Sequence, residues 1–172
     1  MDQHTLSSMT RIAQRHFLEE GLRRVDICLG QLSEDQVWYR PNQSSNSVGI
    51  ILTHLIGNIT QYVISGLGDL PDSRRRDREF DDARRPSKSE LRQALSATLQ
   101  QAISVLQRLT PRDIRQEYRI QGFSLSFLDV VVHVIEHFSY HLGQVAYITK
   151  MVNDRQTGFY AGVDLNASNK PS

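Results

Sequence analysis

Four long segments in which apolar residues recur every three or four positions constrain this chain more than any other feature. That spacing is the period of an amphipathic helix, so each segment is predicted to be helical. The segments run roughly from Thr5 to Leu32, Val48 to Ser65, Ser87 or Ser89 to Leu109, and Leu125 to Val152. They predict an all-α protein built as a four-helix bundle.

The connections between these segments are long. Residues 33–47 and 69–86 exceed the median connection of about four to six residues, so they predict long crossover loops. The 69–86 segment holds six arginines and six acids, which favours a solvated, ion-paired loop over a phosphate-binding patch. Residues 1–152 are predicted to form a single domain, followed by a polar, loosely ordered tail at 153–172.

Composition excludes several classes of protein. The chain of 172 residues carries 20 basic and 19 acidic side chains, a net charge of +1, which argues against a nucleic-acid partner. The single cysteine, Cys28, excludes an intramolecular disulfide and a Cys-cluster zinc site, and it reads as a small core residue. Without an apolar signal segment or about 18 uninterrupted apolar residues, the chain is predicted to be cytoplasmic, with no membrane association.

Two histidines in the last segment point to metal chemistry. His137 and His141 are four residues apart, so on a helix they share one face and both can reach one ion. His141 falls within the apolar stripe and His137 on its border. The zinc-protease pattern HExxH does not apply, because Phe138 rather than glutamate follows His137.

A third histidine, His54, lies at the edge of the apolar face of the second helix. A polar ring there needs a partner. One interpretation is a hydrogen bond to Asn58 or to a backbone carbonyl, as in many core histidines. The other is that His54 meets His137 and His141 across the bundle, where three imidazoles suit a divalent first-row metal.

Further side chains have two interpretations each. Gln144, one turn beyond His141, can orient a ligand or lie on the surface as a plain amide. Asp77 and Glu79 in the long loop can supply a general base or a carboxylate that orients a metal ligand, although most loop acids do neither. No catalytic residue and no organic cofactor site can be assigned from the sequence.

The outer face of the last helix is also apolar, with Val132, Ile135, Leu142 and Ala146 opposite the histidines. A helix that is apolar nearly all round is buried on both sides. It is then either a central helix or the seam of a dimer, and a homodimer is the favoured prediction.

Three stretches carry a resemblance to a known family. They are the segment from Asn46 to Asn58, which contains His54-Leu-Ile-Gly-Asn, the segment Arg76-Asp-Arg-Glu-Phe80, and the segment from His133 to Gln144, which ends in His-Leu-Gly-Gln. Together they resemble the DinB/YfiT-like superfamily, and within it the uncharacterised DUF1572 branch. The resemblance extends from the first helix to about Met151.

The resemblance implies a DinB/YfiT-like four-helix bundle, often dimeric, with a divalent metal held by three histidines. Zinc or nickel is the metal it implies, and the matching positions are His54, His137 and His141. Characterised relatives include S-transferases that use low-molecular-weight thiols and a mycothiol-dependent maleylpyruvate isomerase.

Three functions therefore compete. The first is a metal-dependent enzyme, a thiol S-transferase or hydrolase acting on a small molecule. The second is a non-catalytic metal-binding or stress-response protein. The third is an interaction module whose histidines are hydrogen-bonded core residues.

Overall fold

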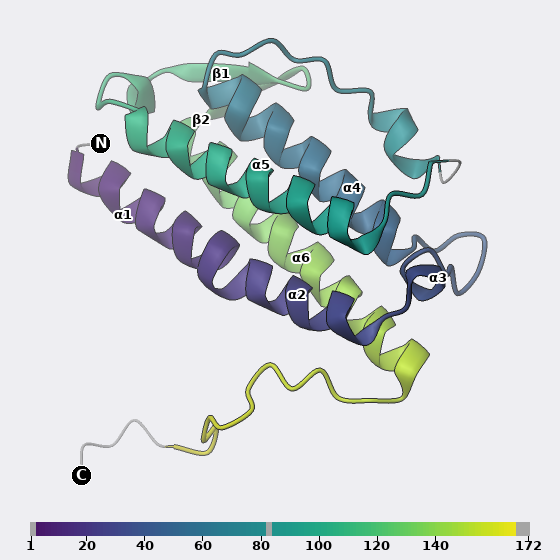
Figure 1. Ribbon diagram of the computed structural model, residues 1–172. Coiled ribbons are helices and arrows are strands. Elements are labelled where there is room, and N and C mark those ends of the chain that lie inside the picture. Colours follow the sequence, from purple (N-terminus) through teal and green to yellow (C-terminus); the bar gives the residue numbers. More distant parts are fainter. Residues whose placement is uncertain (1–2, 82–83, 168–172) are drawn as a thin grey trace.

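The computed structural model describes residues 3–81 and 84–167 (Figure 1). Within these ranges it is mostly helical, and its long helices pack around one core. The long helical segments are α1 (Gln3–Gln14) continued by η1 (Arg15–Gly21) and α2 (Leu22–Gln31), α4 (Val48–Ile59) continued by η2 (Thr60–Leu67), α5 (Lys88–Arg108) and α6 (Phe127–Asn153). Short helices connect them: α3 (Glu34–Val37), η3 (Arg76–Phe80) and η4 (Asp113–Arg115). All four predicted helices are present near their predicted bounds.

The segments η1 and η2 are π-helical, which the apolar spacing did not predict. In η1, Gly21 lies against the side chain of Phe138 in α6. A Cβ at this position would overlap the ring of Phe138 and the carbonyl of His16. The absence of a side chain at Gly21 therefore allows α6 to pack closely here, and the helical segment continues into α2.

Serine side chains fix where three helices begin. Ser47 accepts a hydrogen bond from the backbone N–H of Ile50 at the start of α4. Ser87 and Glu90 form the capping box that their spacing predicts at the start of α5. Ser126 and Asp129 form a second capping box, which starts α6 at Phe127 rather than at Leu125.

The prediction of an all-α protein needs one correction. The strands β1 (Glu117–Ile120) and β2 (Phe123–Ser126) pair antiparallel, with Ile120 opposite Phe123. The two turn residues, Gln121 and Gly122, have φ of 52° and 83°. Positive φ at both positions is what a tight two-residue hairpin turn requires.

The helix Val48–Leu67 is apolar along most of its length. Its mean hydropathy of 1.3 over a membrane-length window would allow it to cross a bilayer, but 72% of that window is buried inside the protein. It packs against α5 and α6. Burial by its own neighbours accounts for its apolar character.

The outer face of α6 is only partly open. Leu142 is buried, and Ile135 and Ala146 pack against the core, whereas Val132 is 56% exposed. The first helical segment covers much of this face. The apolar character of α6 therefore reflects mainly its packing against α2 and α4.

The first part of the tail is tied to the helices. The Arg23 guanidinium donates to the carbonyl of Phe159, and the Gln31 amide donates to the carbonyl of Thr157. Phe159 packs against the core. These contacts hold residues 157–159 against α2. The loose ordering of the tail stays a prediction, and residues 168–172 lie outside the described part of the chain.

Candidate metal centre

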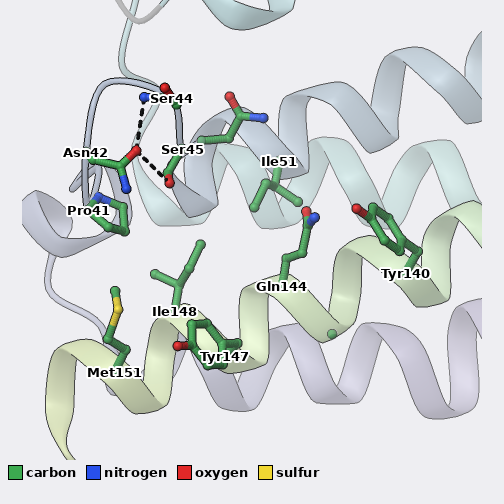
Figure 2. A pocket seen from close by; sticks show the side chains of 12 residues that line it. Pro41, Asn42, Ser44, Ser45, Ile51, Tyr140, Gln144, Tyr147, Ile148 and Met151 are labelled. Carbon is green, nitrogen blue, oxygen red and sulfur yellow. Dashed lines mark hydrogen bonds between the residues drawn. The ribbon is translucent and has the colours of Figure 1, made fainter.

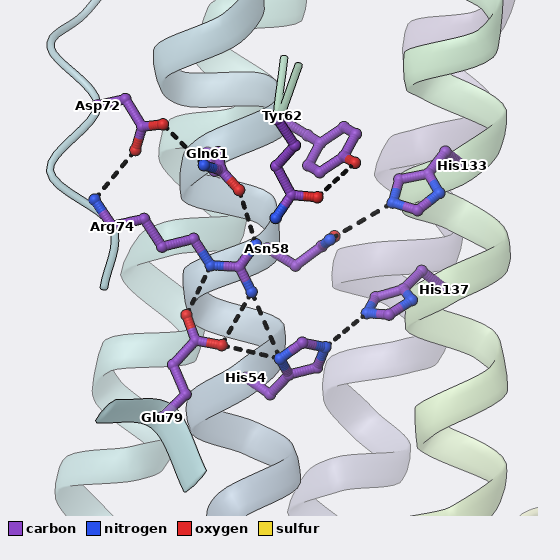
Figure 3. A network of polar contacts seen from close by, with 10 residues as sticks. His54, Asn58, Gln61, Tyr62, Asp72, Arg74, Glu79, His133 and His137 are labelled. Carbon is purple, nitrogen blue, oxygen red and sulfur yellow. Dashed lines mark hydrogen bonds and ion pairs between the residues drawn. The ribbon is translucent and has the colours of Figure 1, made fainter. Parts of the chain in front are cut away.

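Three histidines from two helices converge in the space between α4 and α6. One ring nitrogen of each of His54, His137 and His141 lies within 4.8 Å of the others. The Nε2 atoms of His54 and His137 are 3.0 Å apart (Figure 3). The ring centroids of His54 and His141 are 5.1 Å apart. The structure therefore brings together the three predicted residues, which lie up to 87 positions apart in the chain.

The far nitrogen of His54 is held by a carboxylate. Its Nδ1 lies 2.8 Å from Oε2 of Glu79, which belongs to η3 in the long loop. An ionised carboxylate only accepts hydrogen bonds, so Nδ1 carries the proton and donates it. The Nε2 atom is left with a lone pair that faces the other two histidines.

Glu79 is itself fixed by Arg74. The Arg74 Nε donates to Oε1 at 2.6 Å, and Nη2 donates to Oε2 at 2.8 Å, a two-pronged ion pair (Figure 3). Burial raises the pKa of Glu79, but hydrogen bonds from Arg74 and His54 outweigh burial and hold this pKa below its ordinary value. Arg74 also donates to Gln61. The carboxylate therefore stays ionised and oriented.

The backbone of α4 leaves room for this carboxylate. A Cβ at Gly57 would overlap the Glu79 carboxylate and crowd Nε of Arg74. Gly57 follows His54 by three residues, on the same side of the helix. The small residue therefore lets the loop reach the far side of the His54 ring.

His141 has a comparable arrangement on α6. Its Nδ1 lies 2.7 Å from Oε1 of Gln144. A carbonyl oxygen accepts, so Nδ1 carries the proton and Nε2 carries the lone pair. His54 and His141 are 6% and 9% exposed, and in both rings Nδ1, the nitrogen that points away from the group, has a hydrogen-bond partner.

The electrostatics favour neutral imidazoles at His137 and His141. Burial, with His141, His54, His133 and Arg74 nearby, lowers the pKa of His137 to about 3. Burial also lowers the pKa of His141. Neutral rings at these two positions keep the lone pairs that a metal ion needs.

A fourth histidine lies beside the group without joining it. The His133 ring stacks near His137 at 5.4 Å and lies 4.4 Å from the Tyr62 ring. Its Nε2 is 3.4 Å from the Nδ2 of Asn58. Asn58 Oδ1 is buried without a hydrogen-bond partner among the described residues. The sequence had offered Asn58 as a partner for His54, but it contacts His133.

The structure distinguishes between the two acidic candidates of the long loop. Glu79 contacts His54, whereas Asp77 is exposed. The loop that holds both was predicted to be solvated, yet the Arg74 and Glu79 side chains are only 4% and 8% exposed. Arg74 was missed, because nothing in the run of arginines distinguishes the one that folds inward. Cys28 is buried and burial raises its pKa, in keeping with a core residue.

The donor set fits a first-row divalent metal. Three neutral imidazoles are ligands that zinc, nickel, copper and iron all accept, so the residues do not select one metal. Hydrogen bonds to the far nitrogens of His54 and His141 are the support that metal-binding histidines usually have. These three residues can therefore hold one ion.

Comparison with known proteins gives the family. No curated protein matches the chain. Solved structures similar to this chain include two with a TM-score of 0.62. One is a DinB-like protein from Bacillus cereus at 15% identity, with 78% of this chain and 87% of that chain covered. The other is a DinB-like protein from Bacillus subtilis at 14% identity, with 84% of this chain and 94% of that chain covered. At these identities the likeness concerns the fold. The family model of DUF1572, a protein of unknown function, matches residues 9–160. This chain therefore belongs to the DUF1572 family, with a DinB-like fold.

Proposed function

We propose that this protein is a metal-dependent enzyme, a four-helix bundle of the DinB type in which His54, His137 and His141 hold one zinc or nickel ion. The observation that carries the proposal is the convergence of three ring nitrogens within 4.8 Å, with the outer nitrogens of His54 and His141 hydrogen-bonded to Glu79 and Gln144.

The residues around the site have distinct tasks. Glu79 and Gln144 keep the proton on Nδ1 of His54 and His141, and Arg74 holds Glu79 in place. When bound, a metal with three protein ligands supplies a Lewis acid with positions left for a water, thiol or substrate oxygen. This arrangement supports thiol S-transfer or hydrolysis, with a low-molecular-weight thiol as co-substrate in the first case.

A second function has an observation of its own. The ligand candidates come from two helices, one from α4 and two from α6, so a bound ion ties these helices together. A link of this kind favours a non-catalytic metal-binding or stress-response protein, whose fold is stabilised by the bound ion.

Elemental analysis tests the site. Tag-free wild type, reconstituted with zinc or nickel, is expected to retain about one equivalent of metal, and His54→Ala and His137→Ala are expected to lose it. His133→Ala is the matched control, because His133 lies on the same helix but outside the group. Absence of metal from wild type, or its retention in His137→Ala, contradicts the proposed site.

Turnover separates the two functions. Metal-loaded wild type is assayed for conjugation of a thiol to 1-chloro-2,4-dinitrobenzene and for hydrolysis of p-nitrophenyl acetate. Turnover that is lost in a folded His137→Ala variant supports the enzyme. Bound metal with no turnover on either substrate, together with a large fall in melting temperature on chelation, favours the non-catalytic function.

A further inference from the structure

A cavity of about 630 Å³ opens between the loop at 41–46 and α6 (Figure 2). Its volume lies within the range of about 300–1,000 Å³ typical of small-molecule sites. Ile51 of α4 and Tyr140 and Tyr147 of α6 form part of its wall. The helices that carry the histidines thus also line this cavity.

The cavity adjoins the candidate metal centre through Gln144. This side chain lines the cavity while its Oε1 accepts the proton of His141 Nδ1. Ile51 lies three residues before His54 on α4, and Tyr140 directly precedes His141. A molecule in the cavity would therefore lie against Gln144, the residue that orients His141.

The lining has a distinctive chemistry. None of its 12 residues is charged, although charged residues make up 23% of the chain. A second cavity, of about 580 Å³, differs in this respect, because Asp69, Asp72 and Glu117 are among the residues that line it. An ion in the first cavity would lose hydration without gaining a partner of opposite charge.

The lining does offer hydrogen-bond donors. Asn42 Oδ1 accepts from the Ser44 N–H and the Ser45 hydroxyl (Figure 2), and Gln144 Oε1 accepts from His141. With both amide oxygens used, the amide NH₂ groups are the donors that these two side chains can offer a ligand. Tyr147, which is 66% exposed, adds an aromatic surface.

We propose that this cavity binds the uncharged substrate of the enzyme: a small molecule with an aromatic or apolar body and a carbonyl or amide oxygen as hydrogen-bond acceptor. The inference rests on the proposed function and adds a substrate class to it. In a thiol transfer, this molecule is the acceptor of the thiol rather than the thiol itself.

Three probes of nearly one shape test the class: benzamide, benzoate and benzamidine, which are neutral, anionic and cationic at pH 7. Binding is followed by amide chemical shifts in the zinc-reconstituted protein. Benzamide is expected to shift the signals of Tyr140, Gly143 and Tyr147. The two charged probes are expected to bind at least about fivefold more weakly, because the lining holds no countercharge.

Gly143→Leu blocks the cavity without disturbing the fold. Gly143 lines the cavity, and a Cβ there meets nothing within 4 Å, so the added side chain extends into open space. Gly30→Leu is the matched control, because Gly30 is also helical with nothing within 4 Å and does not line the cavity. Benzamide binding is expected to fall at least about tenfold in the first variant and to stay unchanged in the second.

The outcomes separate this inference from the proposed function, since metal content is measured on the same samples. Three results with metal-loaded protein would overturn the substrate class. They are an absence of chemical-shift changes with benzamide, binding of the charged probes as tight as that of benzamide, and unchanged benzamide binding in Gly143→Leu. Selective benzamide binding by a protein that holds no metal overturns the proposed function but supports an uncharged ligand for the cavity.

Discussion

Glu79 is the residue whose replacement tests the site most directly, because it joins His54 to Arg74. Glu79→Gln keeps the shape but leaves the buried Arg74 guanidinium without its countercharge. We expect metal affinity to fall about 10–100-fold. The metal-free protein should lose about 3 kcal/mol of unfolding free energy. Competition with a chromophoric chelator and urea titration measure the two effects.

Asp77→Asn is the control for that variant, since Asp77 lies on the same short helix but is exposed. Asp77→Asn should change neither the metal affinity nor the free energy of unfolding. Equal metal affinity in Glu79→Gln and wild type would mean that the carboxylate supports only the loop.

Gly57 provides a second test at the residue scale. In Gly57→Ala the new Cβ must displace a carboxylate that Arg74 and His54 hold. We expect weaker metal binding in the chelator competition. Gly30→Ala, in open space, should instead raise stability by up to about 1 kcal/mol, the ordinary gain of alanine over glycine in a helix. Unchanged metal affinity in Gly57→Ala would show that the loop shifts freely.

At the scale of the element, the helix starts are sensitive to pH. Hydrogen bonds from Ser87 and Ser126 lower the pKa values of Glu90 and Asp129 below their ordinary values of 4.5 and 3.8. A carboxyl whose folded pKa is lowered stabilises the protein above its unfolded pKa, and this contribution disappears as the pH falls through the folded pKa. We expect Glu90→Gln and Asp129→Asn to be less stable than wild type at pH 6.

The stability gap between these variants and wild type should narrow from pH 6 to pH 3, because pH 3 lies below the ordinary pKa values of both carboxyls. Urea unfolding at the two pH values measures the difference. A stability gap that stays constant from pH 6 to pH 3 would contradict the capping account.

At the scale of the whole molecule, an ion held by His54, His137 and His141 would join α4 to α6. Zinc at 100 times its dissociation constant stabilises a protein by about 2.7 kcal/mol. For a chain of this size the melting temperature should then rise by about 5–10 °C. The rise should persist in His133→Ala and vanish in His137→Ala, as scanning fluorimetry with and without a chelator would show. Zinc-dependent stabilisation of His137→Ala would place the ion elsewhere.

We also propose that two copies associate through the face formed by α1 and α6. Ile12 and Val132 are 38% and 56% exposed there and share a shallow cavity with Met9. Val132→Glu should halve the mass measured by light scattering, since a charge in an apolar seam is costly. Val163→Glu, at an exposed position in the tail, should leave the mass unchanged. A wild-type monomer would exclude this dimer.

The helices and part of the site are properties of the sequence itself. The three- and four-residue spacing of apolar side chains predicted the helical segments, because helical periodicity is local. The pair His137 and His141 was predictable for the same reason, as neighbours one turn apart on one helix. The capping box of Ser87 and Glu90 is equally local, since its partners are three residues apart.

Tertiary structure decided what depends on distant segments. The inward fold of Arg74 and Glu79, the pairing of β1 with β2, and the cavity beside Gln144 each require two segments to meet. In the sequence, Arg74 is one of six arginines in a charged loop, and no local pattern distinguishes it. Arg74 and Glu79 are distinguished from the other charged residues of the loop only in the folded protein, where Glu79 contacts Nδ1 of His54 in the space left by Gly57. The physical reason is that a buried charge is stable only where a partner of opposite charge is already in place.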